Sequence, residues 1–159
     1  MFGGMENLTT INMDNFVFGE EFDVSGLFSD CPALISISLN GVDTSAVTDM
    51  SGMFENCEKV TSLNLSDFDT ENVRILSSLF NGCRKLTSID LSNFNTKNVI
   101  EMEQVFYRCI SMTDIDLSNF DTRNVKNMSC LFYNCEKLRN VNLSSFNTKN
   151  VNDISFMFW

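Results

Sequence analysis

The sequence contains no histidine, one proline (Pro32) and one tryptophan (Trp159). Without histidine, acid–base catalysis lacks its most common side chain and zinc lacks one of its usual ligands. The six cysteines include no Cys-x-x-Cys pair, so a zinc site has almost nothing from which to be built. A serine or cysteine nucleophile would need lysine or a carboxylate as its base, and the pattern pairs no such groups. We therefore expect no enzymatic activity, no metal and no cofactor.

Basic residues are absent from the first 58 positions, which hold ten acidic side chains, whereas the remainder holds eleven residues of each sign. This asymmetry leaves a net charge of −10. Nucleic acids and anionic lipids require a basic surface, so neither is expected as a partner. The alternatives are a solvated, soluble surface or a basic partner protein.

Long apolar runs are also missing, so the sequence predicts no direct membrane insertion. The first residues, Met1 to Glu6, have neither the basic region nor the apolar region of a signal peptide. Both Met1-Phe2 and Met157-Phe158 match the interior pair Met53-Phe54. This match indicates a piece of a longer array.

What the sequence does have is a 26-residue period, maintained from end to end without insertion or deletion. A fixed period of this length is typical of a solenoid, in which each unit buries its apolar face against its neighbours. We expect one solenoid domain over residues 1–159, made of six repeats: a degenerate first repeat (1–26), regular repeats (27–156) and the start of another (157–159). The main columns are Cys31, Cys57, Cys83, Cys109 and Cys135; Leu39, Leu65, Leu91, Leu117 and Leu143; and Phe2, Phe28, Phe54, Phe80, Phe106, Phe132 and Phe158.

Each repeat combines two spacings. In residues 86–92 the apolar residues are Leu86, Ile89 and Leu91, and the Ile-Asp-Leu alternation predicts a short strand. A turn rich in Asn and Thr follows. Val99, Met102, Val105, Phe106 and Cys109 then recur at the spacing of one helix face. The repeat therefore predicts strand, turn and short helix, with Thr96 or Asn98 as the helix N-cap.

Three columns of small residues are expected to have structural roles. The five cysteines of the repeat are expected to stack as buried, reduced thiols, although neighbouring rungs are close enough that disulfides are not excluded by distance. Cys130 is the one cysteine outside this column. The threonine column is expected to cap helices, and the asparagine column to form turns: Thr44, Thr70, Thr96, Thr122 and Thr148; Asn72, Asn98, Asn124 and Asn150.

The segment Leu86-x-x-Ile89-x-Leu91-x-x-Phe94 resembles a leucine-rich-repeat strand, with Phe where Asn is usual. Residues 117–135, with Leu-Ser-Asn-Phe-Asp-Thr-Arg-Asn-Val, Met-Ser-Cys-Leu-Phe and Cys, resemble the BspA-like leucine-rich-repeat surface proteins. The resemblance covers nearly the whole chain. It implies an α/β, right-handed leucine-rich-repeat solenoid with short parallel strands on the concave side and short helices on the convex side. It also implies a cell-surface or secreted adhesion protein that engages a host or neighbouring-cell protein or glycan.

Strand residues that face away from the core are the candidate binding surface. They are small, polar and mildly acidic, and they lack the Trp, Tyr and Arg anchors of tight interfaces. An alternative is that they only solvate the sheet. The whole array would then be a spacer that displays another domain. A further alternative, which follows from the missing export signal, is an intracellular leucine-rich-repeat interaction protein. The candidate residues are Ser62, Asn64, Ser88, Asp90, Asp114, Asp116 and Asn142.

The C-terminal end is a candidate surface for self-association. Its last strand, near residues 138–143, has no following repeat to pair with, and apolar residues beyond it have no further coil to pack on. Exposed edges and apolar ends favour association.

Overall fold

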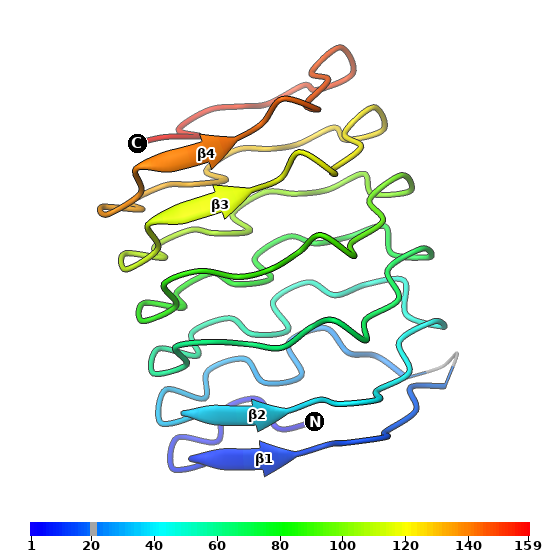
Figure 1. Ribbon diagram of the computed structural model, residues 1–159, viewed down its shortest axis with the longest axis vertical. Helices are drawn as coiled ribbons and strands as arrows, with labels where there is room; N and C mark the ends of the chain where they lie inside the picture. Colours follow the sequence, from blue (N-terminus) through cyan, green and yellow to red (C-terminus); the bar gives the residue numbers. More distant parts are fainter. Residues whose placement is uncertain (20–21) are drawn as a thin grey trace.

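The computed structural model describes residues 1–19 and 22–159. Figure 1 shows a single stack of coils that rises from the N-terminus to the C-terminus, with the strands lying side by side on one face. Four short strands occur in the described residues: β1 (Thr10–Asn12), β2 (Ser36–Ser38), β3 (Asp114–Asp116) and β4 (Asn140–Asn142). The predicted solenoid is therefore the observed architecture.

The register between coils matches the sequence period. Strand β1 pairs in parallel with β2 and strand β3 with β4, and each residue faces the residue 26 positions further on, as Ile11 faces Ile37. Isolated parallel bridges keep the same offset, from Val17 with Asp43 to Asn127 with Asp153. One residue type therefore lies above its counterpart in each coil.

The predicted helices are wrong, because residues 1–19 and 22–159 contain no helix. The segment opposite the strands is instead a chain of β-turns. In the coil that begins near Met50, the Met53 N–H donates to the Met50 carbonyl (3.3 Å), and the Cys57 N–H donates to the Phe54 carbonyl (3.2 Å). Consecutive turns repeat apolar residues every three or four positions, which is the same spacing as a helix face.

Left-handed backbone conformations explain why these turns do not continue into a helix. Two positions in each coil, four residues apart, have φ between 54° and 78°. A right-handed helix cannot pass through such residues, and for residues other than glycine they cost about 1–2 kcal/mol each. The two columns are Gly26, Gly52, Ser78, Gln104, Cys130 and Phe156; and Gly4, Asp30, Asn56, Gly82, Arg108 and Asn134.

The turns also bond the coils to one another, and we call this set of bonds the turn ladder. Alternate N–H groups donate to the carbonyl 25 residues later: Gly52 to Ser77 (2.9 Å) and Phe54 to Leu79 (3.0 Å). The pattern extends from Phe2, which donates to Leu27, to Asn134, which donates to Trp159. A helix would satisfy these groups within one coil, whereas here they connect neighbouring coils.

The strand side is less continuous than the sequence predicted. Residues 62–64 and 88–90 occupy the same columns as β2 and β3, but they are not in strands. The sheet is therefore divided into two two-stranded parts. The most regular hydrogen bonding between coils lies in the turn ladder.

The core is a set of stacked side-chain columns between these two sides. Phenylalanine rings from Phe2 to Phe158 stack with centroids 5.3–5.8 Å apart. The leucine column at Leu39, Leu65, Leu91 and Leu117 is buried beside them. Each coil thus buries its apolar face only against its neighbours, as the period predicted.

The cysteine column is stacked as predicted, and all six cysteines are free thiols in the structure. Each column thiol donates to a carbonyl of the preceding coil, as Cys83 does to Phe54 (3.2 Å). Burial raises the pKa of Cys57 from its ordinary 9.0 to about 12. Because the thiolate is the reactive form, these buried groups should react slowly with thiol reagents. Cys130 and Cys135 are both half-buried, but burial still raises the pKa of Cys135 to about 12, so Cys130 is expected to react first.

The threonines do not cap helices, and that prediction is wrong. The buried Thr96 hydroxyl accepts from the Asp121 N–H (2.7 Å) and donates to the Asp121 carbonyl (3.2 Å) in the next coil. Thr44, Thr70 and Thr122 make the same pair of bonds. A single hydroxyl therefore satisfies both backbone groups of a residue one coil away. The handedness and the curvature of the solenoid stay predictions.

Candidate functional site

We call the seven residues predicted from the sequence as a candidate binding surface the strand face. The structure exposes all seven: Ser62, Asn64, Ser88, Asp90, Asp114, Asp116 and Asn142. Asp114 and Asp116 lie on β3 and Asn142 on β4, and pairing places Asp116 opposite Asn142. The other four come from the two coils without strands.

Several strand-face side chains bond to their own backbone. Asn64, Asp90, Asp116 and Asn142 each accept a hydrogen bond from the N–H two residues later, at 2.9–3.2 Å. These bonds form Asx turns that end the strand segment. One side-chain oxygen in each residue is therefore used by the fold, and the Asn64 amide also donates to Asn40 (3.4 Å), although all four residues remain exposed.

The carboxylates of this face are held in their ionised form. The Ser92 backbone N–H lowers the pKa of Asp90, and the hydrogen bond from Ser118 lowers that of Asp116. The Asn140 amide, which donates to Asp114, lowers the pKa of that carboxyl. The face consequently presents fixed negative charge near neutral pH.

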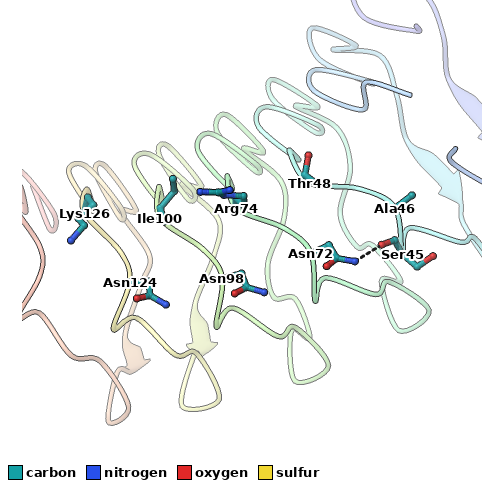
Figure 2. Close-up of a pocket in the computed structure, with 9 residues that line it drawn as sticks. All are labelled: Ser45, Ala46, Thr48, Asn72, Arg74, Asn98, Ile100, Asn124 and Lys126. Carbon is teal, nitrogen blue, oxygen red and sulfur yellow. Dashed lines mark hydrogen bonds between the residues drawn. The ribbon is translucent and has the colours of Figure 1, made fainter. Parts of the chain in front are cut away.

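A second surface was not predicted as a site, and we call it the Asn groove. It is open, has a volume of about 980 Å³ and crosses four coils. Figure 2 shows two rows of side chains along it, the asparagines in one row and Thr48, Arg74, Ile100 and Lys126 in the other. The lining residues are Ser45, Ala46, Thr48, Asn72, Arg74, Asn98, Ile100, Asn124 and Lys126.

The fold fixes both rows of the Asn groove. The Asn72, Asn98 and Asn124 amides donate to carbonyls of the preceding coil at 2.8–2.9 Å. In the other row, the Ile100 N–H donates to the Arg74 carbonyl (2.9 Å), and the Lys126 N–H to the Ile100 carbonyl (2.8 Å). The predicted turn role of the asparagines therefore extends between coils.

Charges near the Asn groove are unevenly paired. Lys97 contacts Glu71 at 2.5 Å and Arg123 contacts Asp121 at 2.6 Å, and these contacts lower the pKa of both acids. Arg74 and Lys126 are exposed and form no ion pair among residues 1–19 and 22–159. The groove thus carries two cations that the described fold does not neutralise.

One signal in the sequence could have identified this groove. Some columns keep one residue type, whereas the column of Thr48, Arg74, Ile100, Lys126 and Asn152, like the adjacent column of Asp49, Ile75, Glu101, Asn127 and Asp153, changes its chemistry between repeats. The fold fixes the backbone of this column but not its side-chain chemistry, so these side chains are free to serve binding.

The C-terminal end presents the apolar surface that the sequence predicted. Phe156 and Phe158 are both 59% exposed and Trp159 is 72% exposed. These rings pack edge-on and stacked against Tyr133 and Phe132. A pocket of about 460 Å³ lies beside them, between Phe132 and Val141.

The part of the chain that the structure describes contains no group of three His, Cys, Asp or Glu side chains that could hold a metal ion. Within the same residues, there is no helix of the length and apolarity that a membrane span requires.

Comparison with known proteins agrees with the repeat architecture. The chain belongs to the DUF285 family, described as "Mycoplasma protein of unknown function", whose model matches residues 1–113 and 58–159. This family, with the solenoid described above, confirms the predicted BspA-like leucine-rich-repeat relationship. A search of curated proteins found no match.

The structure is also similar to the crystal structure of the T. pallidum leucine-rich-repeat protein TpLRR. The two are 18% identical in sequence with a TM-score of 0.62, so the likeness concerns the fold alone. The match covers 98% of this chain and 63% of TpLRR.

Proposed function

We propose that this chain is a non-enzymatic binding module of a cell-surface or secreted leucine-rich-repeat protein. Its partner would be a protein or glycan of a host or neighbouring cell, engaged along the stack. Nucleic acid and direct insertion into a membrane are not part of this proposal, since both the charge and the apolar pattern disfavour them.

The observation that carries the proposal is the strand face. Exposed polar side chains of the same kind recur in consecutive coils and, in β3 and β4, lie directly opposite one another. Repetition of this kind creates an extended surface on which several weak contacts add together. The family and the fold support a repeat scaffold for such a surface.

A spacer is the second candidate function, and a specific observation favours it. The Asx turns show that Asn64, Asp90, Asp116 and Asn142 already have a structural task. If that task is their only one, the strand face would bind nothing and the array would display another domain.

Substitution of the strand face separates these functions. After a panel of matrix proteins and neutral glycans identifies a ligand, changing Asn64, Asp90, Asp116 and Asn142 together to Ala should abolish its binding. Each change removes an Asx bond, so we expect a cost of about 0.5 kcal/mol per residue, below that of a core deletion. Circular dichroism and thermal melting check that the variant remains folded.

The matched control exchanges the amides and carboxylates: N64D, D90N, D116N and N142D. This variant keeps the Asx acceptors and the net charge but rearranges the charge pattern. Partial loss of binding would show that the ligand recognises the arrangement of charges on the strand face. Full binding by the alanine variant, combined with loss on changing Lys97, Glu101 or Arg123, would contradict a role for the strand face.

We also propose self-association through the C-terminal end. Ile154, Phe156, Phe158 and Trp159 are exposed in the structure, and a contiguous apolar surface favours contact with a second copy. Sedimentation of the purified chain beside its F156S/W159S variant tests this proposal, which a concentration-independent monomer would contradict.

A further inference from the structure

The Asn groove has the features of a carbohydrate site. It is open along its length and crosses four coils, and amides line one side of it while two cations project from the other. We propose that it binds a linear polysaccharide that carries carboxylate or sulfate groups and lies parallel to the axis of the stack. This site is separate from the strand face, so it stands or falls independently of the function proposed there.

The spacing of the groove favours a glycan that runs along it. Parallel bridges and hydrogen bonds at an offset of 26 residues set the rungs about 4.8 Å apart. An extended peptide advances only about 3.4 Å per residue and would lose register with successive rungs. In an extended linear glycan each ring advances the chain by close to one rung, so successive sugars stay beside successive asparagines.

The asparagines retain the groups that sugar hydroxyls need. Each amide has two N–H donors and an oxygen with two lone pairs. In Asn72, Asn98 and Asn124, one N–H bonds to the preceding coil, and this bond fixes the side chain. Within the described residues, the second N–H and the oxygen make no further hydrogen bond. These groups are therefore held in place and available for hydroxyl recognition.

The two cations select an acidic glycan. Arg74 and Lys126 are two rungs apart, with Ile100 between them. The nearby acids Glu71 and Asp121 are already paired, whereas Glu101, which follows Ile100, pairs with no described cation. Arginine can bind a carboxylate or sulfate in bidentate fashion, and lysine provides a point charge. Two acidic groups separated by one sugar would meet both.

Other polymers fit the groove less well. A peptide ligand would need apolar or aromatic pockets, whereas the apolar lining consists of Ala46 and Ile100 alone. Nucleic acid presents a phosphate at every step, and two cations on a chain of net charge −10 cannot match them.

Direct binding to immobilised polysaccharides tests the proposal. The probes are a linear polyuronate with an acidic group on every second sugar, its sulfated counterpart and a neutral linear glucan of equal length. The intact chain should bind at least one acidic polymer more than ten-fold tighter than the glucan, and added salt should weaken this binding. Comparing the polyuronate with the sulfated polymer shows which acidic group is preferred.

The decisive variant is R74Q/K126Q, and the matched control is R84Q/K137Q. The control removes one arginine and one lysine, both exposed and outside the Asn groove. We expect at least a ten-fold loss of affinity for the groove variant and less than a two-fold loss for the control. Equal losses in both variants would overturn the proposal, because they would indicate attraction by charge alone.

Two further results would overturn the proposal that the Asn groove binds an acidic polysaccharide. One is an intact chain that binds neither acidic polymer better than the glucan, and the other is tighter binding of an acidic peptide or RNA of equal charge. The strand-face alanine variant distinguishes the two surfaces. It should retain polysaccharide binding whether or not the strand face has its own ligand.

Discussion

Each buried threonine hydroxyl connects its coil to the next at a single residue. Its two hydrogen bonds satisfy both the N–H and the carbonyl of one residue in that coil, as Thr96 does for Asp121. The hydroxyl is buried, so water cannot replace these bonds without rearrangement. Residues of this kind explain how short coils with few strand hydrogen bonds remain in register.

A substitution of Thr96 by Val tests this role. Valine keeps the shape but leaves two backbone groups of Asp121 without partners, which should lower the free energy of unfolding by about 1–3 kcal/mol. The control is Thr148→Val in the same column. Thr148 is exposed, so its loss should cost under about 0.5 kcal/mol. Urea unfolding measures both, and equal costs would contradict the bridging role.

At the scale of the element, the turn ladder replaces the predicted helix. A glycine substitution has opposite effects on stability in a helix and in the turn ladder. A glycine inside a helix destabilises it by about 1 kcal/mol, whereas glycine at a left-handed position relieves strain of similar size. Ser78 has φ of 59°, and in the same column Gly26 and Gly52 already occupy that conformation.

Ser78→Gly is therefore expected to raise the free energy of unfolding by about 1 kcal/mol. The control is Ser77→Gly, at a neighbouring residue without positive φ, which should lower stability by about 0.5–1 kcal/mol. Chemical unfolding measures both changes. Destabilisation by Ser78→Gly, together with a helical far-ultraviolet spectrum, would show that this segment is a helix after all.

The sequence was sufficient for every feature that depends on the period alone. It predicted the solenoid, the 26-residue register, the phenylalanine and cysteine columns and the exposure of the strand-face residues. It could not separate turns from helices, because Val99, Met102 and Phe106 recur at a spacing common to both. The discriminating columns carry only a partial glycine signal: Gly26, Gly52 and Gly82 occupy left-handed positions, but Gln104 and Arg108, with φ of 58° and 57°, occupy them without glycine.

The strand face was predicted from the sequence, whereas the Asn groove was not. The strand-face residues follow from the alternation of a strand, so Asp114, Asp116 and Asn142 were selected correctly as exposed. The Asn groove depends on side chains that bond to the preceding coil, and no local pattern shows which way Asn98 or Asn124 turns. Arg74 and Lys126 lie in a column whose function the repeat itself does not specify.

At the scale of the whole molecule, stacking converts single residues into continuous surfaces. The strand face, the Asn groove and the turn ladder each extend over several coils. A ligand that follows the axis would therefore gather its binding energy from several weak rungs rather than from one deep pocket. This is the central claim about how the chain functions.

The dependence of affinity on ligand length tests that claim most directly. Calorimetric titration of the intact chain with acidic oligosaccharides of increasing length should show weak binding for a disaccharide. Affinity should rise once a ligand reaches both Arg74 and Lys126, and should level off near three rung spacings, about 14 Å, the span from Thr48 to Lys126. A disaccharide that binds as tightly as the longest oligosaccharide would contradict the claim, because it would place the whole binding energy on one rung.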